Sequence, residues 1–254
     1  MLKLLTNPPL CFLLCLFVFS IAAWGGAWFH RRTWNSDTES YGDFAFVVGG
    51  ILTLLALILG FTFSMAVTRY DQRKNFEEQE ASSIATAYLR ASQLPNTDAN
   101  TVRKLLRSYL GQRISFYLSE AGTDSNQLER QTNDLQRSLW SASASAINLS
   151  ASPNSVLVLS GMNDVFRSRS QTESSWRNRI PHSALMLVIV IAILSNFLVG
   201  YTAHRRGLFL LLVLPLAVSI SLFMIVDIDS PRGGYIRVRP QSLERLSDFL
   251  SAGN

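Results

Sequence analysis

Four long runs of apolar residues alternate with polar stretches along the 254-residue chain. The runs extend over residues 9–29, 44–68, 183–203 and 207–226, and none of them contains a charged residue. A bilayer core about 30 Å thick is crossed by about 20 residues of helix. In lipid such a segment must be helical, because its backbone groups find no other hydrogen-bond partners. The pattern therefore predicts four transmembrane helices.

The first run has a second interpretation. Lys3, followed by an apolar stretch that ends in small residues, has the layout of a signal peptide. The stretch is long for a signal peptide, and Trp24, Trp28 and Trp34 fit an interfacial belt of aromatic residues. We interpret the run as a transmembrane helix, and the signal peptide stays open as the alternative.

The polar stretch between the second and third runs is predicted to be helical. Residues 70–94 continue the second run without a helix breaker, so one helix is expected to leave the membrane and to end before Pro95. In the rest of the stretch, apolar residues recur at the spacing of amphipathic helices. They are expected to form a helix-packing core: Val102, Leu105, Leu106, Tyr109, Leu110, Ile114, Leu128, Leu135, Leu139, Trp140, Leu157, Leu159, Met162, Val165 and Phe166.

Charged residues of this stretch are expected on the solvated faces of its helices. Glu77, Glu78 and Glu80 form one such group, and Arg113 lies opposite the apolar side of its helix together with Arg103, Lys104 and Arg107.

The expected fold is an all-α membrane protein with four transmembrane helices and a cytoplasmic helical insert between the second and third. Residues 1–69 hold the first two transmembrane helices, 70–181 the insert, 182–227 a transmembrane hairpin, and 228–254 a cytoplasmic C-terminal tail.

Composition and charge agree with a membrane protein. Mean hydropathy is +0.19, and 16% of residues are charged, against about 25% in soluble domains. The net charge of +5 could indicate nucleic-acid binding, but the basic residues gather beside the apolar runs, so the expected partner is lipid and not nucleic acid. Cytoplasmic loops are enriched in Arg and Lys. With both termini in the cytoplasm, only four basic residues of the membrane-flanking segments lie outside: Arg31, Arg32, Arg205 and Arg206.

No motif of the sequence indicates an enzyme, a metal site or a cofactor. His30, His182 and His204 are scattered and lack metal-ligand spacing. The chain has no P-loop, no zinc-protease motif and no dinucleotide fingerprint.

Two clusters of ionisable residues lie at predicted membrane boundaries. The clusters are Arg69, Asp71 and Arg73 after the second run, and Asp227, Asp229 and Arg232 after the fourth. The favoured interpretation is interfacial anchoring with an ion pair between neighbouring helix ends. The alternative is the lining of an ion vestibule, because ionisable groups near a pore set its field.

The second run resembles the pore helix of bestrophin channels. In that helix a Gly-Phe pair is followed, nine residues after the Gly, by an Arg and then by aromatic residues. Gly60, Phe61, Arg69 and Tyr70 match this pattern, and Asp71 departs from it.

A larger part of the chain, about residues 43–240, resembles the bestrophin-like domain family of bacterial and plant membrane proteins. The matching segments are Arg69-Tyr70-Asp71, Glu80-Ala81, Thr86-Ala87-Tyr88-Leu89-Arg90, Asn178-Arg179-Ile180-Pro181, and Asp227-Ile228-Asp229-Ser230-Pro231-Arg232-Gly233.

The resemblance implies a homo-oligomeric ion channel, a pentamer by analogy, with a central pore and a cytosolic helical domain. It implies a pore neck at Thr53, Leu57 and Phe61, whose spacing of four puts them on one helix face. Thr53 departs from the apolar character of the neck, and packing of Leu57 and Phe61 against neighbouring helices stays an alternative. The calcium-binding acidic clasp of animal bestrophins has no match.

The expected function is conduction of a chloride-like anion across a bacterial inner membrane, without cofactor or metal. The alternative is a membrane-anchored scaffold or regulator whose helical insert binds a cytoplasmic partner.

Overall fold

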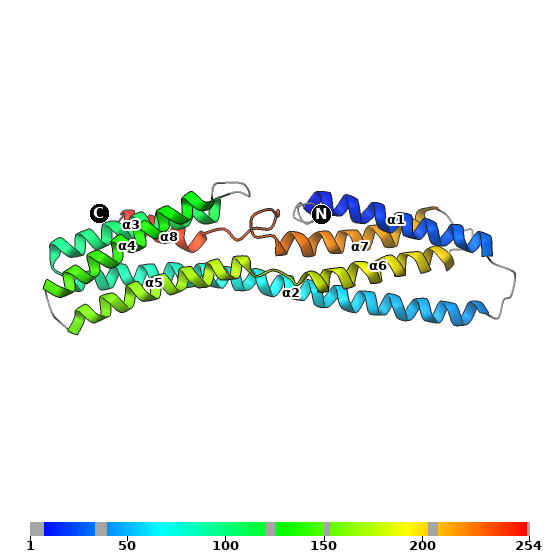
Figure 1. Ribbon diagram of the computed structural model, residues 1–254, viewed down its shortest axis with the longest axis horizontal. Helices are drawn as coiled ribbons and strands as arrows, with labels where there is room; N and C mark the ends of the chain where they lie inside the picture. Colours follow the sequence, from blue (N-terminus) through cyan, green and yellow to red (C-terminus); the bar gives the residue numbers. More distant parts are fainter. Residues whose placement is uncertain (1–7, 34–39, 120–124, 150–152, 203–207, 253–254) are drawn as a thin grey trace. The chain divides into compact units, whose positions relative to one another are not determined.

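The computed structural model describes residues 8–33, 40–119, 125–149, 153–202 and 208–252. These residues form eight α-helices and one short 3-10 helix, and no strand occurs among them (Figure 1). The all-helical class predicted from the sequence is confirmed.

The chain divides into two compact units. The first unit contains Met1–Arg69 and Arg179–Arg237, and the second contains Tyr70–Asn178 and Val238–Asn254. The last of the three divisions along the chain falls after Arg237, within the segment that the sequence suggested as a single C-terminal tail.

The first unit holds four helices that are long and apolar enough to cross a membrane, as predicted. They are α1 (Pro8–Thr33), the first part of α2 (Ser40–Arg90), α6 (His182–Thr202) and α7 (Leu208–Asp229). The connection between the third and fourth runs, 203–207, lies outside the described residues.

Helix α1 packs tightly against α6 through two glycines. A Cβ atom at Gly26 would overlap the carbonyl oxygen of Phe197, and one at Gly200 would overlap the carbonyl oxygen of Ala23. Small residues let membrane helices approach until their backbones touch. Helix α1 also contacts α7, with Phe12 and Phe223 ring to ring at 6.1 Å. This packing supports the interpretation of the first run as a transmembrane helix.

Helix α2 continues without interruption through residue 90, as its sequence predicted. It is followed by the 3-10 helix η1 (Ala91–Gln93) and by Leu94 in an extended conformation. The residue before a proline is pushed out of the helical region by the proline ring. Pro95 therefore ends the helix, and α3 begins at Asn96.

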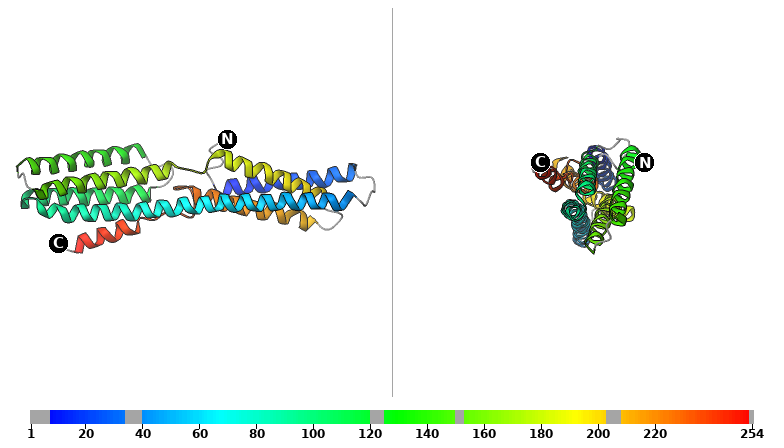
Figure 2. Two further views of the ribbon diagram at one scale, coloured as in Figure 1. Left: turned by 90° about the horizontal axis from the view of Figure 1, so that it is seen from below. Right: turned by 90° about the vertical axis from the view of Figure 1, so that its left-hand side faces the viewer.

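The second unit is a bundle of helices that run beside one another (Figures 1 and 2). It combines the later part of α2 with α3 (Asn96–Leu118), α4 (Ser125–Leu149), α5 (Pro153–Arg177) and α8 (Gln241–Ala252). Most of the expected apolar positions lie in or against its core, Val102, Leu106, Leu139 and Met162 among them. Trp140 and Leu157 were assigned wrongly to the core, since their side chains are 43% and 49% exposed.

Candidate functional site

The three residues of the expected neck lie on an exposed face of α2 within the first unit. Leu57 is 54% and Phe61 63% exposed, and Thr53 is exposed as well. The hydroxyl of Thr53 donates a hydrogen bond of 2.9 Å to the carbonyl of Gly49, one turn earlier. Because its polar group is bonded to the backbone of its own helix, Thr53 interrupts the apolar character of this face only weakly.

The apolar part of α2 is the least covered of the candidate membrane helices. Only 11% of its most apolar window is buried, against 28% for α1 and 44% for α7. Exposed apolar surface of this extent marks contact with lipid or with other protein. Within the chain itself, the face that carries Leu57 and Phe61 is therefore open.

Arg73, assigned to the first ionisable cluster, is a buried residue of the second unit with 1% of its side chain exposed. Its guanidinium donates to the carbonyl oxygens of Ser175 at 3.5 Å and Asn178 at 3.4 Å. These carbonyls lie at the C-terminal end of α5, where a helix leaves carbonyls without internal partners. A cation is favoured there by the helix dipole. Arg73 thus caps α5.

The two aspartates of the second ionisable cluster hold backbone segments of the first unit. Asp227, 1% exposed, accepts hydrogen bonds from the amides of Tyr235 at 2.8 Å and Ile236 at 3.0 Å. Asp229 accepts from the amide of Ile180 at 3.1 Å, just before α6. Two segments of the family resemblance, around Ile180 and around Asp229, therefore meet in space.

The remaining members of the clusters are more accessible. Arg69 and Arg232 are half-buried and Asp71 is exposed. Of the six residues in the two clusters, three are therefore buried, two are half-buried and one is exposed. An ion vestibule lined by these residues stays a prediction.

A buried polar network connects the helices of the second unit. Arg113 of α3 is fully buried and donates Nε and Nη2 to the carboxylate of Glu80 of α2, which is fully buried too. Its Nη1 donates to Glu173 of α5 at 3.2 Å. Glu80 accepts two further bonds, from the hydroxyls of Tyr117 at 3.2 Å and Thr172 at 3.1 Å.

Arg169 of α5 extends the network to α4. It donates to Glu173 at 2.6 Å, to the amide oxygen of Asn133 at 2.8 Å and to that of Gln136 at 2.6 Å. Two arginines and two glutamates balance in charge. Buried charges are tolerated when they are paired and their remaining polar atoms are hydrogen-bonded. The network therefore allows α2, α3, α4 and α5 to pack together in one specific arrangement.

The protonation states of the network follow from its geometry. Burial alone would lower the pKa of Arg113, but its neighbours, with the Glu80 carboxylate first among them, together outweigh burial and raise that pKa above its ordinary value. Burial raises the pKa of Tyr117, so its hydroxyl keeps its proton and remains a donor. Among the described residues, no three His, Cys, Asp or Glu side chains are placed to hold a metal ion.

The burial of these charged residues differs from what their sequence predicted. Glu77 and Glu80 were expected on a solvated face, yet they are 2% and 0% exposed, and Arg113 is buried and not on the polar side of α3. The spacing along α2 could have indicated that Glu80 is buried. Glu80 lies on the same face of the helix as Ile84 and Ala87, and α2 buries this face.

Glu77 has a different role, as a cap for the C-terminal helix. Its Oε1 accepts hydrogen bonds from the amides of Ser242 at 2.8 Å and Leu243 at 3.0 Å, in the first turn of α8. The first amides of a helix lack internal partners, and a negative charge there is stabilising. A carboxylate 165 residues away in sequence therefore anchors α8.

Glu77→Ala is expected to loosen α8, because loss of an N-terminal cap costs about 0.5–2 kcal/mol. Limited proteolysis of the full chain in detergent should show faster cleavage within residues 241–252. Glu78→Ala is the matched control, because Glu78 is exposed on the same helix. Equal cleavage of the two variants would contradict the capping role.

Comparison with known proteins gives one family and several solved structures of the same fold. The family model of the Bestrophin-like domain matches residues 17–243. No curated protein is significantly similar to the chain in sequence.

Two of the similar solved structures are of bacterial bestrophin homologues from Klebsiella pneumoniae, each with a single substitution. One covers 95% of this chain and 98% of its own length, with 11% identity and a TM-score of 0.62. A second covers 96% and 98%, with 10% identity and a TM-score of 0.64. A structure described as a membrane protein covers 95% and 96%, with 10% identity and a TM-score of 0.66. At such low identity these likenesses show a common fold. The family model covers most of the chain, and the chain therefore belongs to the bestrophin-like family.

Proposed function

We propose that this protein is the subunit of a homo-oligomeric ion channel of the bestrophin type. The observation that carries the proposal is the exposed apolar face of α2 at Leu57 and Phe61. It lies where the resemblance to bestrophins implies the pore neck. A hydrophobic constriction of this kind gates ions by controlling whether water fills it.

Assembly into an oligomer supplies the surface that α2 lacks within one chain. Several copies that turn this face toward a common axis would form a neck from rings of Phe61, Leu57 and Thr53. A closed ring is the ordinary outcome of repeated head-to-tail contacts. We propose a pentamer by analogy with bestrophins.

The proposed location is a bacterial inner membrane, with both termini and residues 70–181 in the cytoplasm. The distribution of Arg and Lys beside the apolar runs supports this orientation. In this arrangement Arg69, Asp71 and Arg232 would lie at the cytoplasmic edge of the membrane, where they would set the field near the pore.

The proposed permeant ion is chloride or a similar anion. The net charge of +5 supports an anion, since basic surfaces raise the local concentration of anions near a pore entrance. The reversal potential in asymmetric potassium chloride measures this choice directly, because an anion-selective and a cation-selective pore give opposite signs.

Purified protein in planar bilayers is expected to give unitary currents, and Phe61→Ala should change conductance or open probability by about twofold or more. Phe63→Ala is the matched control. Phe63 is also exposed on α2, at 41%, but two residues along a helix turn it to another side.

Two measurements would contradict the proposal. One is the absence of currents over a range of potentials from protein that is folded and reconstituted. The other is a monomer or dimer by native mass spectrometry in mild detergent, which would favour a membrane-anchored scaffold instead.

A further inference from the structure

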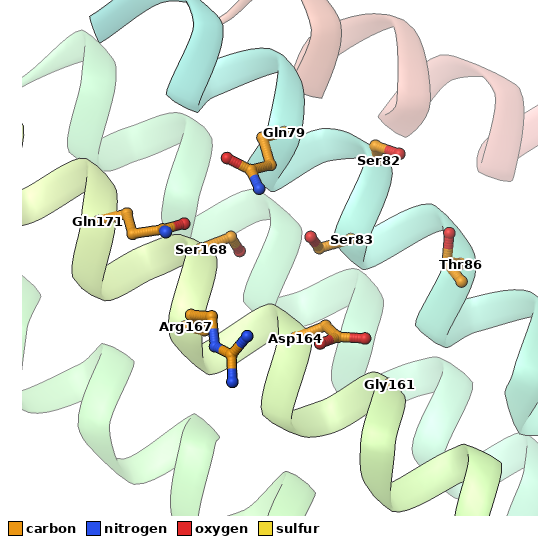
Figure 3. A pocket seen from close by; sticks show the side chains of 9 residues that line it. All are labelled: Gln79, Ser82, Ser83, Thr86, Gly161, Asp164, Arg167, Ser168 and Gln171. Atoms are coloured by element: carbon orange, nitrogen blue, oxygen red, sulfur yellow. The ribbon is translucent and has the colours of Figure 1, made fainter. Parts of the chain in front are cut away.

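A polar groove lies between α2 and α5, entirely within the second unit (Figure 3). It has a volume of about 280 Å³, and eight of its nine lining residues carry polar side chains. Figure 3 shows Gln79 and Ser83 of α2 facing Ser168 and Gln171 of α5. The other lining residues are Ser82, Thr86, Gly161, Asp164 and Arg167.

The packing of the two helices explains why the groove exists. They run antiparallel, since Ala87 lies beside Gly161 while Glu80 bonds to Thr172 further along α5. At Gly161 the backbones are close, because a Cβ there would lie 3.4 Å from the Cα of Ala87. Short side chains such as Ser83 and Ser168 do not fill the space beyond this contact.

Several groups in the groove have unused hydrogen-bonding capacity. The Oε1 atom of Gln171 is buried and accepts no hydrogen bond from any residue that the structure describes, and such an atom costs about 1–3 kcal/mol when left unsatisfied. Of the groove hydroxyls, that of Ser168 donates to the carbonyl of Val165 at 2.9 Å, whereas the hydroxyl of Ser83 forms no hydrogen bond with the described residues.

The charges of the groove favour an anion. The carboxylate of Asp164 is 3.6 Å from Arg90, which offsets its charge. Arg167 is exposed, and within the described residues no ion pair forms at it, whereas the buried Arg113 and Arg169 of the same unit are both paired with glutamates. A guanidinium with free donors binds a carboxylate through two parallel hydrogen bonds.

We propose that this groove binds a small carboxylate that also carries a hydrogen-bond donor such as a hydroxyl. The guanidinium of Arg167 holds the carboxylate, and the donor satisfies Oε1 of Gln171. The hydroxyl of Ser83, which also lines the groove, supplies a further bond. The volume is near the lower end of the range for small-molecule sites, about 300 Å³, so the ligand is smaller than a nucleotide. This site is separate from the proposed neck and does not depend on conduction.

The test is calorimetric titration of the full chain in detergent with L-malate, and with succinate, which lacks only the hydroxyl. Malate is expected to bind, and succinate roughly five- to tenfold more weakly, since one net hydrogen bond is lost. Gln171→Leu should abolish this preference for malate without loss of folded protein, because it removes an unsatisfied buried atom. Equal affinity for malate and succinate in the unaltered protein would overturn the role of Gln171.

The positive charge is tested with a matched pair of variants. Arg167→Gln is expected to weaken malate binding about tenfold or more. Arg130→Gln removes the same charge from an exposed position of α4 outside the groove and should leave binding unchanged. Absence of malate binding to the unaltered protein, or equal weakening by both variants, would overturn the site.

Discussion

Arg113→Met is expected to lower the free energy of unfolding of the second unit by about 3–5 kcal/mol. The substitution leaves the carboxylate of Glu80 fully buried without its guanidinium partner. An uncompensated charge in a helix core is far more costly than the loss of an exposed ion pair. Thermal unfolding in mild detergent, followed by circular dichroism, should show a drop in Tm on the order of 10–20 °C.

Two control variants separate the buried charge from general damage. Arg137→Met removes an arginine whose pair with Asp134 is exposed at the surface of α4, and it should change Tm little. The double variant Arg113→Met with Glu80→Leu removes both charges and should recover much of the lost stability, because apolar replacements of a buried pair are often tolerated. A double variant no more stable than the single one would refute the charge argument.

Gly26→Ala is expected to destabilise the first unit by about 1–3 kcal/mol, the range for overpacking a close contact. The added methyl group would overlap the carbonyl oxygen of Phe197 on α6. Backbone atoms cannot rotate away as a side chain can, so α1 and α6 must separate. The yield of monodisperse protein after extraction and its Tm in detergent measure the effect.

Gly25→Ala is the matched control, one position away on the same helix. A Cβ at Gly25 would meet no atom of another described helix within 4 Å. Alanine is favoured over glycine in a helix by roughly 1 kcal/mol, so this variant should be neutral or slightly stabilising. If both variants behaved alike, the close approach at Gly26 would not matter for stability.

The contacts behind these predictions join residues that are distant in sequence, so no single stretch of sequence reveals them. Most of the helices, in contrast, could be predicted from the sequence. The long continuous α2 followed from a run without Gly or Pro between Phe61 and Leu94. Its end followed from Pro95, whose ring excludes a helical conformation at the preceding residue. The end of α7 at Asp229 agrees with the Ser230-Pro231 pair that follows it.

The errors concern charged residues. Glu77 and Glu80 belong to a charged segment whose sequence predicts exposure to solvent. They are buried because α3, α5 and α8 pack against this part of α2. Arg73 was assigned to a membrane-edge cluster, which stays a prediction; its role as a cap of α5 was not foreseen. The partners of these side chains lie 33 to 166 residues away in sequence, so no local pattern could indicate them.

The sequence by itself determined which segments are long and apolar enough to cross a membrane, and where the long helices end, because hydrocarbon-length apolar runs and proline act locally. The tertiary structure decided which charges are buried, which glycines bring backbones together and which face of α2 stays open. These properties depend on what another helix places opposite a residue, and the free energy of a buried charge is set by that neighbour.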